Sequence, residues 1–272
     1  MSDYENQRSR AVSPVLRTKD AVVDEQGTAV IPAGTREIFD MAFQENPQMI
    51  RVVLPDSVRK VGSRAFAGCE NLREVHLNDG LEILEGNVFN GCTRLEELVL
   101  PSSLRQVHAY AFNHTSFRAP VYDRSGTILY HYPEQAPVTS FAVPQGVKRL
   151  AHGAFLGCAA LEEVHLPESL EVIEREAFVN TAIRSITIPA SVKAVEGFAF
   201  WNCRNLVQVE LLCDGHAANA YAFYRCPGVR LRQQGSEVPL PQKLRLQGVD
   251  LLGVSDKLEV PKSNFWKKKA FV

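Results

Sequence analysis

A phenylalanine recurs along the 272-residue chain at an almost constant interval. The steps between successive members are 23, 23, 23, 43, 23, 22 and 23 residues, for Phe43, Phe66, Phe89, Phe112, Phe155, Phe178, Phe200 and Phe223. A fixed period of this size is typical of stacked coils, because one such unit cannot bury its own apolar side chains. The sequence therefore predicts one elongated solenoid with a continuous core.

Each unit also carries two further apolar patterns. The run Leu72-x-x-Val75-x-Leu77 recurs in most units and predicts a short strand whose alternate side chains point inward and outward. A parallel row of such strands is expected from about Ile50 to Leu211. A second apolar pair, such as Val58 and Val61, predicts an extended or irregular return segment, and the Ala-Phe pair predicts a short helical turn.

The period fails in the middle of the chain and at its two ends. The 43-residue step contains about 20 extra residues, roughly 118–137, in which two β-rich runs flank Asp123–Gly126 and predict a hairpin. Residues 1–27 are polar and predict an N-terminal arm or partial cap, before a solenoid over 28–230. Residues 231–272 keep leucines without the period and predict a C-terminal cap with a basic aromatic tail at 265–271.

These units resemble the 23-residue BspA-type (Treponema pallidum-type) leucine-rich repeat. Its pattern reads roughly Leu-x-x-Val-x-Ile-Pro-x-Ser-Val-x-x-Ile-Gly-x-x-Ala-Phe-x-Gly-Cys, and Pro101-Ser102-Ser103-Leu104 and Pro189-Ala190-Ser191-Val192 fit it closely. The resemblance implies a β-rich, right-handed leucine-rich-repeat superhelix of about eight coils with short helical turns. It also implies a role in adhesion or protein binding.

Five of the six cysteines lie three residues after a repeat phenylalanine: Cys69, Cys92, Cys158, Cys203 and Cys226. Neighbouring coils bring such positions within the range of a disulfide, about 5 Å apart. Periodic placement favours small, buried and reduced core residues instead. No cysteine and histidine spacing typical of zinc is present, so no metal and no cofactor is expected.

The outward strand positions are the candidate binding residues, since leucine-rich-repeat proteins offer a concave strand face. Tyrosines of the inserted hairpin are expected to add aromatic anchors. The full predicted set is Arg51, Glu74, His76, Glu97, Val99, Tyr122, Tyr130, Tyr132, Glu163, His165, Gln208 and Glu210. The glutamates favour a protein partner that carries basic residues.

Two chemical alternatives use the same residues. Glu74 and Glu97, on adjacent strands, would approach the separation of about 5–5.5 Å found in retaining glycosidases. His76 and His165 could be metal ligands, but at about 14 Å apart they are too distant for one ion. A solvated acidic stripe and surface histidines are the favoured interpretations.

The whole-chain charge and hydropathy narrow the function further. Thirty basic and 31 acidic residues give a net charge of −1, which favours neither nucleic acid nor a stable membrane association. The longest apolar run in the first 27 residues is only residues 21–23, so no signal peptide is visible. A cytoplasmic location is expected, with surface exposure as the alternative.

We expect a non-enzymatic, monomeric protein-interaction scaffold. The alternatives are an exported surface adhesin and a carbohydrate-active or hydrolytic enzyme.

Overall fold

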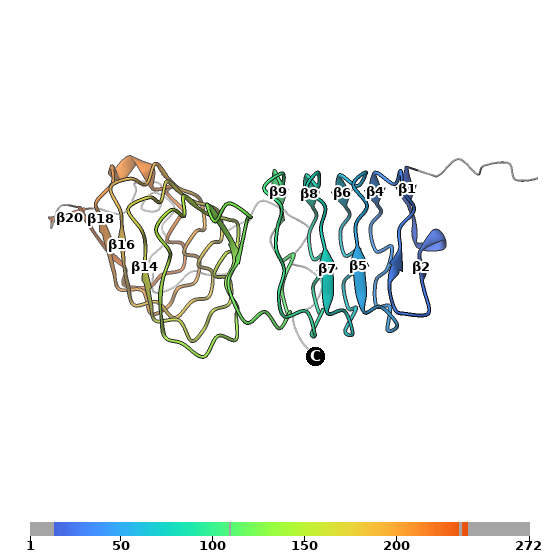
Figure 1. The fold of residues 1–272 in the computed structure, drawn as a ribbon. Coiled ribbons are helices and arrows are strands. Elements are labelled where there is room, and N and C mark those ends of the chain that lie inside the picture. Colours follow the sequence, from blue (N-terminus) through green and yellow to red (C-terminus); the bar gives the residue numbers. More distant parts are fainter. Residues whose placement is uncertain (1–13, 109, 234–235, 239–272) are drawn as a thin grey trace, which may run out of the picture.

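The computed structural model describes residues 14–108, 110–233 and 236–238, and these form a β-solenoid of about nine turns with almost no helix (Figure 1). The predicted fold class is therefore confirmed. The basic aromatic tail predicted at 265–271 lies outside the described residues.

Most coils have a longer strand on one wall, and these strands stack in parallel on their neighbours. Near the N-terminus, β5 (Arg51–Val53) pairs with β7 (Glu74–His76). The second half holds a six-stranded sheet of β12 (Ser140–Ala142), β14 (Glu163–His165), β16 (Ser185–Ile188), β18 (Gln208–Leu211), β19 (Arg230–Gln233) and β20 (Ser236–Val238). Within this six-stranded sheet, only β20 runs antiparallel to its neighbour.

The return segments form a second wall, which is more regular than the sequence predicted. One ladder comprises β1 (Val15–Leu16), β4 (Glu37–Ile38), β6 (Lys60–Val61), β8 (Ile83–Leu84) and β9 (Gln106–Val107). The other comprises β10 (Val121–Tyr122), β11 (Ile128–His131), β13 (Arg149–Leu150), β15 (Val172–Ile173) and β17 (Ala194–Val195). Val58 and Val61 are fully buried, as their spacing predicted.

The described parts of the two predicted caps extend this architecture. In the N-terminal segment, β1 pairs in parallel with β4, and β2 (Val22–Val23) forms an antiparallel pair with β3 (Ala29–Val30). The only helices among the described residues are two short 3₁₀ turns, η1 (Thr18–Asp20) and η2 (Gly215–Ala217).

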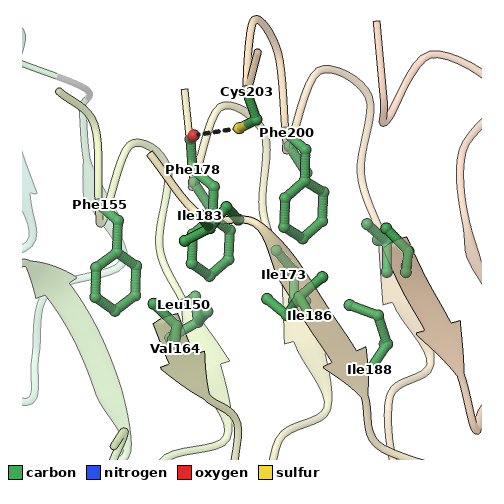
Figure 2. Packing of buried hydrophobic residues seen from close by; sticks show 14 of the residues in the cluster. Leu150, Phe155, Val164, Ile173, Phe178, Ile183, Ile186, Ile188, Phe200 and Cys203 are labelled. Carbon is green, nitrogen blue, oxygen red and sulfur yellow. Dashed lines mark hydrogen bonds between the residues drawn. The ribbon is translucent and has the colours of Figure 1, made fainter. Parts of the chain in front are cut away.

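The repeat phenylalanines form a stacked spine inside the solenoid. The ring of Phe66 is fully buried, with its centroid 5.4 Å from that of Phe43 and 5.7 Å from that of Phe89. In the second half, Phe178 stacks 4.9 Å from Phe155 and 4.8 Å from Phe200 (Figure 2). Stacking between coils thus buries side chains that a single coil would leave exposed.

The register cysteines form no disulfides, and their thiols donate hydrogen bonds to backbone carbonyls of the spine residues. All five are buried and free, as predicted. The thiol of Cys203 lies 2.9 Å from the carbonyl oxygen of Phe178 in the preceding coil (Figure 2), and that of Cys92 lies 3.2 Å from the carbonyl oxygen of Phe66. Burial raises the pKa of the Cys69 thiol to about 11, which keeps it protonated as a hydrogen-bond donor.

The predicted helical turn at each phenylalanine is wrong. Residues two before and two after the phenylalanine have positive φ, such as Arg64 at 56° and Gly68 at 71°, and this alternation is incompatible with a helix. It points the amides of Arg64, Phe66 and Gly68 at the next coil, where they donate to carbonyl oxygens 2.8–3.1 Å away. Glycine or asparagine at several of these positions lowers the strain.

The extra residues form the predicted hairpin of β10 and β11, but that hairpin is built into the solenoid wall. β11 pairs in parallel with β13, and the amide of Tyr132 donates to the carbonyl of Ala154, as spine phenylalanines do to the next coil. Tyr132 lies 23 residues before Phe155 and its ring stands 5.2 Å from that ring, so it is the spine residue of its own coil.

A seam divides the solenoid where this hairpin enters. β9 ends the first return ladder, and the second begins with β10 and β11, so no ladder bonds join the two. The buried side chains fall into two clusters, and the N-terminal cluster reaches across the seam to include Val121, Tyr130 and Ala151. Figure 1 shows the coils of the two stacks facing in different directions. His131 is buried at the seam, with its ring 5.9 Å from Phe112 and 5.8 Å from Phe117.

Replacing Phe66 with alanine should lower the free energy of unfolding by about 3–5 kcal/mol, because a cavity replaces a fully buried ring. Denaturant melts of the full chain measure this loss. Phe39→Ala is the matched control: Phe39 is 39% exposed, and its loss should be about 1 kcal/mol or less. Equal losses for the two variants would show that the phenylalanine spine does not stabilise the core.

The buried His131 should make the protein less stable in mild acid. Burial lowers its pKa to about 4, whereas an unfolded histidine has a pKa of about 6.5. Above pH 6.5 both states are neutral. As the pH falls towards 4, only the unfolded chain binds the proton, so stability falls by up to about 3 kcal/mol.

Denaturant melts from pH 7.5 to pH 4 test this prediction. His131→Leu should flatten the pH dependence relative to the wild type, whereas the exposed control His165→Asn should keep it. If His131→Leu and the wild type lose stability in parallel, His131 is not the titrating group.

Candidate functional site

The candidate site is the strand face, which comprises the outward side chains of β5, β7, β12, β14, β16 and β18 and of residues 97–99. The register of the strands is the one that the repeat spacing predicts. Arg51 lies opposite Glu74, and Glu163 lies opposite Ser185, which in turn lies opposite Gln208. Equivalent positions of successive coils therefore form straight rows across each sheet.

Most of the predicted binding residues on this face are open to solvent. The exposed ones are Arg51, His76, Glu97, Val99, Glu163, His165 and Gln208, and the half-buried ones are Glu74 and Glu210. Between them, the inward residues Val52 and Val209 are fully buried. Outward exposure was thus predicted correctly from the alternation alone.

The expected continuous row of strands is wrong, because it breaks at residues 97–99. No strand forms there, and only Leu100 makes a bridge, to Asp123 in the hairpin. The amides of Ser116 and Arg118 in the following coil donate to the carbonyls of Leu95 and Glu96 before the chain turns into β10. Glu97 therefore does not lie on a strand paired with β7, although its neighbour Leu98 stays buried.

Charged groups on the strand face are partly neutralised by one another. The carboxylate of Glu74 lies 2.6 Å from the guanidinium of Arg51 and 2.5 Å from the His76 ring. The hydrogen bond from His76, with that from Arg51, lowers the pKa of Glu74. The same Glu-Val-His run recurs on β14, where Glu163 and His165 lie 3.3 Å apart.

This geometry leaves the glycosidase-like hypothesis without its carboxylate pair. Glu74 is held between the Arg51 guanidinium and the His76 ring, and Glu97 lies in the segment that forms no strand. Within the described chain, no group of three or more histidine, cysteine, aspartate or glutamate side chains is arranged to hold a metal ion. No helix in that part of the chain is long and apolar enough to cross a bilayer.

The predicted aromatic anchors are largely absent from the surface. Tyr130 is 6% exposed and Tyr132 is 4% exposed, while Tyr122 is half-buried. The expectation that the hairpin offers exposed tyrosines is wrong for Tyr130 and Tyr132, because β11 is a rung of the return ladder. The 23-residue spacing from Tyr132 to Phe155 is the signal that could have shown this.

Exposed valines take the place of the missing aromatic anchors. Val99 is 65% exposed and Val53 is 46% exposed, both at outward positions of the strand face. Of the ten large apolar side chains exposed in the described chain, six lie on or beside the strand-face segments: Ile50, Val53, Val99, Val138, Val207 and Leu212. Val99 is among the binding residues predicted from the sequence, whereas Val53 is not.

A family model described as a BspA type leucine rich repeat region, in six copies, matches residues 26–133 and 127–236. The chain belongs to this leucine-rich-repeat family. The match covers both stacks and the seam between them, so the hairpin interrupts the array without ending it. No curated protein sequence matches the chain.

Several solved structures of repeat proteins are similar to this chain. A leucine-rich repeat protein from Eubacterium ventriosum ATCC 27560 shares 16% identity over 74% of this chain and 63% of that chain, with a TM-score of 0.49. The pneumococcal vaccine antigen PcpA shares 20% identity over 75% and 67%, with a TM-score of 0.42. The T. pallidum leucine rich repeat protein shares 28% identity over 58% and 77%, with a TM-score of 0.37.

Proposed function

We propose that this protein is a non-enzymatic scaffold that binds a protein partner across its strand face. The family assignment supports a repeat scaffold, and repeat proteins use extended surfaces built from many coils. The two return ladders, the phenylalanine spine and the coil-to-coil hydrogen bonds hold the backbone of this surface in place. A partner would thus meet a largely preformed surface, which reduces the entropy cost of binding.

The observation that carries the proposal is the exposure of valines among charged groups on this face. Val53 and Val99 present apolar surface to solvent from positions whose backbone is fixed by buried neighbours. Burying each of them against a partner contributes about 1–2 kcal/mol. Apolar contacts rimmed by polar groups are the usual anatomy of a protein interface.

Charge on the strand face adds selectivity for the partner. Glu74 is paired with the guanidinium of Arg51, so the acidic contribution rests mainly on Glu97 and Glu163, which form no ion pair with an arginine or lysine of the described chain. The fitting partner has an apolar patch flanked by basic side chains. Such charge complementarity speeds association more than it strengthens the final complex.

Site-specific photocrosslinking tests where a partner binds. A photoreactive residue at position 99 should capture the partner, whereas one at position 39 should not. Phe39 is a suitable control because it is 39% exposed but directly follows β4 of the return ladder, on the other wall from the strand face. Crosslinking of the same protein from both positions, or from position 39 alone, would contradict the proposal.

The captured partner then allows an affinity measurement. The double variant Val53→Ser with Val99→Ser should weaken binding by about thirtyfold, because it removes two apolar contacts worth about 2 kcal/mol together. Phe39→Ser should leave the affinity unchanged, and circular dichroism should show all variants folded. Unchanged affinity in the folded double variant would exclude these valines from the interface.

A further inference from the structure

The seam opens a pocket on the return-strand wall, away from the strand face. Its volume is about 220 Å³, and it lies where β9 ends one ladder and β11 and β13 continue the other. The N-terminal stack contributes Arg105 and His108 to its lining. The C-terminal stack contributes Tyr130, Arg149, His152 and Glu174.

Donor groups outnumber acceptors among these side chains. Glu174 is the only carboxylate in the lining, and it already accepts the amide of His152 at 2.9 Å and lies 3.4 Å from the guanidinium of Arg149. Outside the lining, Glu85 lies 3.3 Å from His108, and Glu176 lies 3.4 Å from His152. The histidines are therefore held in place by carboxylates that do not line the pocket.

Arg105 has no carboxylate partner, unlike Lys60 and Lys193 on the same wall. Lys60 lies 3.4 Å from Glu37 one coil before and 3.4 Å from Glu85 one coil after, and Lys193 lies 2.6 Å from Glu171. Arg105 is exposed, and no carboxylate of the described chain lies within ion-pair distance of it, as is also the case for Arg36 and Arg59 at the equivalent positions of earlier coils. Arg105 differs from those two arginines because it lines the pocket.

We propose that the seam pocket binds the oxyanion of a small acidic ligand, a carboxylate or a phosphate. Guanidinium groups present paired donors that match the oxygens of both anions. Arg105 and Arg149 line the pocket from the two stacks, and the buried Tyr130 also lines it. The volume is below the roughly 300–1,000 Å³ of pockets for drug-sized ligands, so the ligand is a single small ring or smaller.

The position of the pocket gives binding a structural consequence. Arg105 belongs to the stack that ends at β9, whereas Arg149 belongs to β13. No strand pairing joins the two return ladders, and the Tyr110 hydroxyl donates to Glu176 across the seam at 3.2 Å. An anion held by both guanidinium groups would join the two stacks across the seam. Ligand binding is therefore expected to raise the thermal unfolding midpoint, since it favours the state in which both groups are in place.

Calorimetric titration of the full chain tests the proposal with three probes. These are inorganic phosphate, glucuronate as a carboxylate sugar, and neutral glucose, all at constant ionic strength set with chloride. At least one anion should bind saturably, whereas glucose should not. Saturation by phosphate alone or by glucuronate alone would assign the anion class, and saturation by both would indicate recognition of the oxyanion itself.

Arg105→Gln is the informative variant because Arg105 is exposed and its loss leaves no partner unpaired. It should weaken anion binding by about ten- to a hundredfold, the equivalent of one charge-assisted hydrogen bond. Arg94→Gln changes an exposed arginine outside the lining and should have no effect. The proposal is overturned if neither anion binds saturably, or if Arg105→Gln and Arg94→Gln bind as the wild type does.

Discussion

Contacts at the spine phenylalanines join one coil to the next, and Phe66 shows all three kinds. The amide of Phe66 donates to the carbonyl of Val88, its ring stacks on both neighbouring rings, and its own carbonyl accepts the thiol of Cys92. All three depend on one phenylalanine in every 23 residues with a cysteine or other small residue three positions later. The return strands and the inward strand residues recur at fixed distances in sequence from this phenylalanine. Because each coil has the same orientation as the one before, the outward side chains of the strands form straight rows.

The seam is where this constraint is relaxed, and the unusual surfaces of the molecule gather there. The 20 extra residues separate Phe112 from Tyr132, which resumes the spine against Phe155. The buried core divides into two clusters, the strand row breaks at residues 97–99, and the return wall opens a pocket beside Arg105. Val99 is the most exposed of the large apolar side chains in the described chain. Local departures from an otherwise consistent pattern often mark functional sites, and here one insertion produces several.

The period allowed the buried phenylalanines, the inward pair Val58 and Val61, and the opposition of Arg51 and Glu74 to be predicted, because it states which residues are equivalent. It could not give the backbone conformation at positions such as Arg64. A turn with alternating positive and negative φ and a helical turn would both bury the same phenylalanine, so the spacing does not distinguish them. The burial of Tyr130 and the missing strand at Glu97 escaped prediction for a different reason. Both depend on where the extra residues rejoin the stack, and only the spacing from Tyr132 to Phe155 indicates that point.

Native-state hydrogen exchange resolved to single residues tests the coil-to-coil contacts most directly. The amides of Phe43, Phe66, Phe89, Phe155, Phe178 and Phe200 each donate to a carbonyl of the next coil. They should be among the most protected in the protein, by about a thousandfold or more over an unstructured chain. The amide of Arg124, in the turn of the hairpin, should exchange fast. Rapid exchange at the phenylalanine amides, comparable with that of Arg124, would contradict the account, because the coils would then not be joined at the spine.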